Sequence, residues 1–133
     1  MTQKRTFGYN KLVRDKIIDS MRDKGDEFEL TQLDDVAFEQ ALIAKLLEEV
    51  TELQTSPESD RNNELVDINE VFQELVRLRK LSALEIETLM ESKRDKSGGF
   101  ATRSYIGTVT LAQDNPWLEY LLQNPERYPE ITS

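Results

Sequence analysis

Two long stretches of the chain carry apolar residues at intervals of three and four, and a short breaker separates them. The first stretch runs from about Asp34 or Asp35 to Gln54, and the second from about Arg61 to Lys80. The breaker, residues 55–60 (TSPESD), contains a proline, which interrupts helical hydrogen bonding. The spacing predicts two long amphipathic helices, and their short connection favours an antiparallel pair.

A shorter helix is predicted before the long pair. Residues 12–24 place their apolar side chains on one side of a helix, with Asn10 as a candidate N-cap. Gly25 follows the last helical residue and is a typical C-terminal stop. The N-terminal region therefore contributes a third amphipathic element.

A fourth helix is predicted after the long pair. Ser82 and Glu85 form a capping-box pattern, and the helix that they open runs to about Lys96, before two consecutive glycines. Four amphipathic helices with short connections predict an all-α fold, an antiparallel four-helix bundle.

The remaining segments predict smaller additions to this bundle. Residues 27–33 (EFELTQL) alternate apolar and polar side chains, which is typical of a short strand or an extended connector. Residues 103–111 (RSYIGTVTL) are rich in β-formers and are candidates to pair with 27–33 as a two-stranded flap. Residues 116–123 (PWLEYLLQ) predict a short helix.

With 133 residues, the chain has the length of one domain. We expect residues 1–111 to form the helical domain. Residues 112–133 are expected to form a C-terminal arm that packs on this domain or on a partner subunit.

Acidic residues occupy positions on the first long helix where an apolar core requires apolar side chains. At about 100° per residue, Glu49 lies about 20° from Leu42, inside the apolar stripe. Glu52 follows on the flank of the stripe, three residues later. Residues i and i+3 of a helix point the same general way, so these two carboxylates form a pair.

The second long helix repeats this arrangement. Glu64 falls in the middle of an arc of Leu, Ile, Val and Phe side chains, and Asp67 lies at the edge of that arc. Again two acids are three residues apart, and again one of them takes a core position.

Carboxylates on two core faces need compensation, because a buried and unpaired carboxylate costs several kcal/mol or becomes protonated. A base could supply it, and Lys45 projects close to Glu49 and Glu52. A divalent cation is a better match, because four carboxylates on facing helices offer the oxygen ligands that hard cations prefer. An ordinary solvated or salt-bridged surface is the alternative.

Composition narrows the chemistry. The chain has no Cys and no His, which excludes thiol nucleophiles, zinc fingers and imidazole acid–base catalysis. Carboxylates, Lys, Arg, hydroxyls and an oxygen-held metal such as Mg²⁺ or Mn²⁺ remain. The net charge of −9 argues against binding a nucleic acid polymer. No apolar run approaches the length of a membrane span or a signal peptide, so a cytoplasmic location is expected.

Four segments together resemble one known superfamily. EEVTE at 48–52 and ELVD at 64–67 look like the EExxE and ExxD motifs of the all-α nucleotide pyrophosphohydrolases, the MazG-like and phosphoribosyl-ATP pyrophosphohydrolase-like superfamily. YNKLVRDKI at 9–17 and KRDKSGGF at 93–100 resemble the N-terminal signature and the Lys-rich ending of its small house-cleaning branch. The resemblance covers about residues 7–101.

The resemblance implies a MazG-like bundle that hydrolyses a nucleoside triphosphate, canonical or modified, to the monophosphate and pyrophosphate. It implies Mg²⁺ or Mn²⁺ as cofactor and a homodimer or homotetramer. Residues matching the metal ligands are Glu49, Glu52, Glu64 and Asp67. Glu48 matches the leading Glu of the motif, and Glu48 or Glu52 is the candidate catalytic acceptor of the proton from water.

Basic residues near the two outer motifs are candidates for phosphate contacts. They are Lys11, Arg14, Lys16, Lys93, Lys96 and Arg103. Arg14 could instead form an ion pair with Asp15. Two other functions stay open: a non-catalytic helical interaction module with a structural cation site, and a dedicated phosphoribosyl-ATP or dUTP hydrolase.

Overall fold

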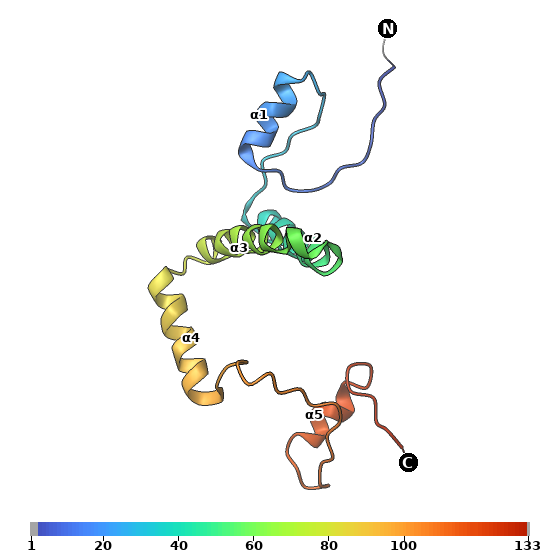
Figure 1. Ribbon diagram of the computed structural model, residues 1–133, viewed down its shortest axis with the longest axis vertical. Coiled ribbons are helices and arrows are strands. Elements are labelled where there is room, and N and C mark those ends of the chain that lie inside the picture. The colour runs from blue at the N-terminus through green and yellow to red at the C-terminus, as the bar shows by residue number, and fades with distance from the viewer. Residues whose placement is uncertain (1–2, 133) are drawn as a thin grey trace. The chain divides into compact units, whose positions relative to one another are not determined.

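The computed structural model describes residues 3–132, and its regular elements are helices (Figure 1). In chain order they are α1 (Asp15–Asp23), α2 (Asp35–Thr55), the single 3₁₀ turn η1 (Glu58–Asp60), α3 (Arg61–Leu78), α4 (Ala83–Ser97) and α5 (Leu118–Gln123). No strand forms within residues 3–132, which confirms the all-α class. The expected two-stranded flap is wrong, because neither residues 27–33 nor residues 103–111 form a strand.

Capping explains where the helices begin and end. The Asp34 side chain accepts a hydrogen bond from the backbone N–H of Ala37 at 2.9 Å and starts α2. Ser82 Oγ accepts from the backbone N–H of Glu85 at 3.0 Å and starts α4. Gly25 has a φ of +81°, a conformation that ends the α1 segment at low cost.

The first helix begins later than the sequence predicts. Asn10 has a φ of +46° and lies five residues before α1 begins, so it does not cap the helix. Arg14, with an extended backbone, is the residue that precedes α1. Residues 3–14 therefore form an irregular N-terminal segment, which positions basic side chains ahead of α1.

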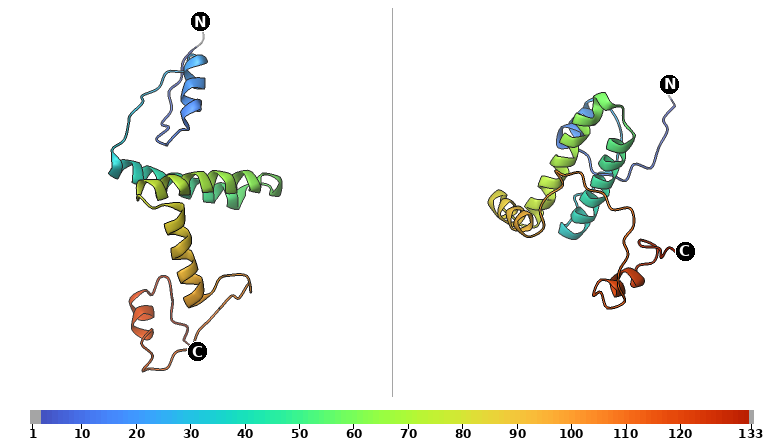
Figure 2. Two further views of the ribbon diagram at one scale, coloured as in Figure 1. Left: turned by 90° about the vertical axis from the view of Figure 1, so that its left-hand side faces the viewer. Right: turned by 60° about the horizontal axis from the view of Figure 1, so that its bottom comes forward.

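Helices α2 and α3 pack side by side as a hairpin joined by residues 56–60 (Figure 2). Leu42 on α2 and Val71 on α3 are the apolar side chains buried between them, with exposed fractions of 3% and 8%. Within residues 3–132, α2 and α3 are the helices of the expected bundle that pack extensively on one another. A bundle of four helices stays a prediction.

The chain divides into two compact units, and the boundary between them along the sequence falls within α4, between Ser92 and Lys93. In the second unit, the rings of Trp117 and Tyr120 meet in a T-shaped arrangement, and Tyr120 in turn contacts Tyr128. These aromatic contacts hold the segment that follows α5. The expected boundary after residue 111 stays a prediction. Within the described residues, none of the helices has the length and apolar character required to cross a membrane.

Candidate metal centre

The hairpin brings the two acidic pairs together because they lie at matching distances from the turn. Glu52 and Glu64 are each six positions from Glu58, and Glu49 and Asp67 are each nine positions from it. In an antiparallel pair of helices, residues equally far from the turn lie at the same height. The i,i+3 spacing then aligns both pairs on one face of the hairpin.

Three of these carboxylates converge. One oxygen from each of Glu49, Glu64 and Asp67 lies within 4.8 Å of the other two. Glu49 is 5% exposed, the lowest exposure of any charged residue described, while Glu64 and Asp67 are half-buried. We call these three residues the acidic triad.

Two oxygens of the triad are buried and lack a hydrogen-bond donor. They are Oε2 of Glu49 and Oε2 of Glu64. A buried acceptor without a partner costs about 1–3 kcal/mol, so such atoms require an explanation. An ion bound between the carboxylates supplies one.

The electrostatics of the triad favour taking up positive charge. Burial and the neighbouring carboxylates of Glu52 and Glu49 raise the pKa of Glu64 to about 7. Burial and the carboxylate of Glu52 also raise the pKa of Glu49, although Lys45 opposes the shift. A carboxylate has no hydrogen to donate, so these groups hydrogen-bond to one another only when one of them is protonated.

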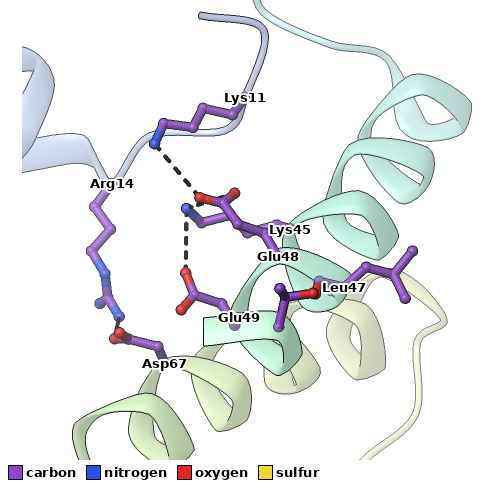
Figure 3. A network of polar contacts seen from close by, with 8 residues as sticks. Lys11, Arg14, Lys45, Leu47, Glu48, Glu49 and Asp67 are labelled. Carbon is purple, nitrogen blue, oxygen red and sulfur yellow. Dashed lines mark hydrogen bonds and ion pairs between the residues drawn. The ribbon is translucent and has the colours of Figure 1, made fainter. Parts of the chain in front are cut away.

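Lys45 and Lys11 neutralise the outer side of the cluster (Figure 3). Lys45 Nζ lies 3.4 Å from Oε1 of Glu49 and 3.4 Å from Oε2 of Glu48. Lys11, from the N-terminal segment, lies 3.6 Å from Oε1 of Glu48. Burial opposes the charged form of Lys45, but attraction to the two glutamates outweighs it and raises the pKa of Lys45. Lys45 therefore stays charged beside the triad.

Arg14 reaches the triad from the other side. Its Nη2 donates a hydrogen bond of 2.8 Å to Oδ1 of Asp67, and Figure 3 shows the side chain crossing from the N-terminal segment to α3. Arg14 thus pairs with Asp67 and not with Asp15. The two ion pairs made by Lys11 and Arg14 connect the N-terminal segment to both helices of the hairpin.

The acidic triad fits a hard divalent cation. Mg²⁺ binds oxygens at about 2.1 Å, which places ligands on opposite sides of the ion about 4.2 Å apart. Oxygens within 4.8 Å of one another need only small side-chain movements to reach that geometry. The all-oxygen donor set favours Mg²⁺, Mn²⁺ or Ca²⁺ over softer metals. The triad could therefore hold a metal ion.

The structure places the other predicted site residues differently. Glu52 is exposed and lies outside the close triad, although its charge acts on Glu49 and Glu64. Glu48 is turned toward the two lysines. Lys16 lies on the exposed surface of α1. Lys93, Lys96 and Arg103 belong to the second unit, and their contact with phosphate stays a prediction.

The pairing of Arg14 with Asp67 was not predicted, because residues 53 positions apart meet only through the tertiary fold. Lys45 was visible as a base close to Glu49, and its i,i+4 position is the signal for the ion pair that forms. Comparison of the chain with models of protein families, with curated proteins and with solved structures found no match.

Proposed function

We propose that this chain is a metal-dependent nucleoside triphosphate pyrophosphohydrolase, which converts an NTP to its NMP and pyrophosphate. The observation that carries the proposal is the buried Oε2 of Glu49, which has no hydrogen-bond partner in a triad completed by Glu64 and Asp67. The order of the four motifs along the chain supports this reaction over other uses of a metal.

A divalent cation at the triad would neutralise phosphate charge and lower the pKa of a water molecule. In the reaction, the water oxygen bonds to the α-phosphorus while the bond from that phosphorus to the bridging oxygen breaks. Pyrophosphate leaves with the electron pair, and the water proton passes to a carboxylate of the chain.

Glu52 is the better candidate for the proton acceptor. It is exposed and adjoins both Glu49 and Glu64, whose pKa values it raises. Both oxygens of Glu48, in contrast, face ammonium groups of Lys45 and Lys11. Glu48 therefore serves to hold these two cations beside the site.

The test is pyrophosphate release from a panel of canonical and modified nucleoside triphosphates, with phosphoribosyl-ATP and dUTP included, in the presence of Mg²⁺. We expect turnover that is lost in Glu49→Gln and in Asp67→Asn. Glu70→Gln is the matched control, because Glu70 is an exposed acid on α3 outside the triad. Exclusive use of phosphoribosyl-ATP or dUTP would identify a dedicated hydrolase.

Two results would contradict the proposal. Full activity in Glu49→Gln and Asp67→Asn would show that these residues are not metal ligands. Stabilisation by Mg²⁺ without turnover of any nucleotide would show that the protein is a non-catalytic module with a structural cation site.

We also propose that two copies of the chain associate through α2 and α3. A stripe of apolar side chains follows α2 at intervals of seven, four and three, and all of its members are exposed: Val36, Ile43, Leu47 and Val50. Leu65 and Phe72, seven residues apart on α3, are exposed as well. A second hairpin laid on this stripe would complete four packed helices, and the self-complementary contact of a symmetric dimer would close it.

A further inference from the structure

Arg14 occupies a position from which it opposes a cation at the acidic triad. Its guanidinium lies 2.8 Å from Oδ1 of Asp67, and Asp67 supplies one of the three converging oxygens. A divalent cation bound there would share this carboxylate with a positive charge, and like charges at such a distance repel. The same residue that completes the triad is therefore held by an internal cation.

The contact between Arg14 and Asp67 is one that the protein can exchange. The side chains of Arg14 and Asp67 are 59% and 38% exposed, and exposed ion pairs contribute little to the stability of a fold. The backbone of Arg14, in contrast, is fixed, because its carbonyl accepts a hydrogen bond from the N–H of Ile17 in the first turn of α1. The guanidinium can thus leave Asp67 while its Cα stays beside the site.

The alternative partner for a released guanidinium is an anion brought to the same place. Guanidinium groups bind phosphate oxygens in a bidentate way, with charge-assisted hydrogen bonds. The second tie of the N-terminal segment, from Lys11 to Glu48 at 3.6 Å, is also half-exposed and keeps the segment near the hairpin after Arg14 has moved.

We infer that Arg14 couples cation binding to nucleotide binding: it pairs with Asp67 in the empty site and transfers to the triphosphate when the cation and the nucleotide bind. This inference rests on the proposed function. Arg14 weakens the binding of the cation alone and strengthens the binding of the cation and the nucleotide together. Because coupling between two ligands is reciprocal, a bound nucleotide must also tighten the binding of the cation.

The test measures Mn²⁺ binding to the full chain by electron paramagnetic resonance, first alone and then with a nucleoside triphosphate that carries a non-hydrolysable α,β-methylene bridge. Removal of the ion pair in Arg14→Gln is expected to tighten binding of Mn²⁺ alone by about 1.5-fold to 5-fold. The same variant should bind the nucleotide analogue more weakly than the wild type. Arg14→Lys keeps the charge, so both of its affinities should fall between those of the wild type and those of Arg14→Gln.

Arg22→Gln is the matched control, because Arg22 lies on α1 and pairs with Asp19 on the same helix. It should change neither measurement, and circular dichroism melts should show that each variant is folded. Failure of the wild type to bind Mn²⁺ would overturn the proposed metal site itself. Binding by the wild type that is unchanged or weaker in Arg14→Gln, or an undiminished affinity of that variant for the analogue, would overturn the coupling and leave the metal site standing.

Discussion

Glu49 of α2 and Glu64 of α3 converge across the hairpin, and each has a buried carboxylate oxygen that no hydrogen-bond donor reaches. Burial and the neighbouring Glu52 raise the pKa of both groups, and Lys45 offsets only part of this rise at Glu49. The metal-free hairpin therefore keeps an excess of negative charge at its most buried polar position.

The first prediction concerns pH. The pKa of Glu64 rises from an ordinary value of 4.5 to about 7, so between these values the native chain holds a proton that the unfolded chain has released. The free energy of unfolding of the metal-free protein should fall as pH rises through this window and level off above about pH 7. Cation binding requires the ionised form, so Mn²⁺ affinity should rise about tenfold from pH 6 to pH 8.

Glu64→Gln is the control for this pH dependence, because the amide imitates the protonated carboxyl. Thermal melts of the metal-free variant should match those of the wild type near pH 4 and exceed them near pH 8. A Mn²⁺ affinity of the wild type that is flat across this range would show that Glu64 is not the titrating ligand.

The second prediction concerns Lys45. Lys45→Met removes the ammonium partner of Oε1 of Glu49. Glu49 is only 5% exposed, so water cannot readily replace that partner. We expect urea unfolding of the metal-free protein to report a loss of about 1–3 kcal/mol, the cost of a buried acceptor left without a donor. Saturating Mn²⁺ should recover part of this loss, because the cation supplies the missing charge.

Two variants make the Lys45 experiment specific. Lys45→Arg should retain most of the stability, and Lys16→Met, at an exposed position of α1, should change it little. Equal losses in Lys45→Met and Lys16→Met would mean that the pairing of Lys45 with Glu49 does not support the hairpin.

The third prediction separates the proton acceptor from the metal ligands. Glu52 lies outside the close triad, so Glu52→Gln should retain Mn²⁺ binding within a few-fold, whereas Glu49→Gln should lose it. If Glu52 accepts the proton from water, its removal should lower kcat for pyrophosphate release by about 10²–10⁴-fold. Glu48→Gln should cost much less, and the reverse order of the two losses would assign the acceptor to Glu48.

The fourth prediction concerns assembly. Leu47 is 63% exposed within the apolar stripe of α2, so Leu47→Glu places a charge in the proposed contact between copies. Light scattering should report a dimer for the wild type and the 15.4 kDa monomer for this variant. Asn63→Asp adds a charge at an exposed polar position of α3, about 160° around the helix from Leu65, and should leave the dimer intact. A monomeric wild type would contradict the proposed assembly.

Helical periodicity and the short connection were enough to predict the hairpin and the inward position of Glu49, because the apolar stripe of each helix is a pattern within one segment and a short connection favours antiparallel neighbours. Asp34 and Ser82 act as the caps that their residue types predict. The extended segments could not be assigned in the same way. Residues 27–33 alternate like a strand, but a strand also requires a partner, which no local pattern specifies.

The basic residues of the site also differ in whether local sequence spacing predicts their contacts. Lys45 was visible from its i,i+4 spacing to Glu49. The contact of Arg14 with Asp67 depends on where the irregular N-terminal segment returns to the hairpin, and irregular backbone carries no periodic signal. Asn10, whose residue type is a common N-cap, adopts a positive φ instead, and α1 begins five residues later, at Asp15.

The equal spacing of both acidic pairs from Glu58 makes the length of the connection between α2 and α3 a functional quantity. If α3 took up one inserted residue as an additional α-helical residue at its start, the acids of α3 would turn by about 100° and move by about 1.5 Å relative to α2. Glu64 and Asp67 would then leave the face that Glu49 occupies. Exposed loops usually tolerate insertions, but relatives of this chain that keep the site should keep the length of this turn even where its residue types vary.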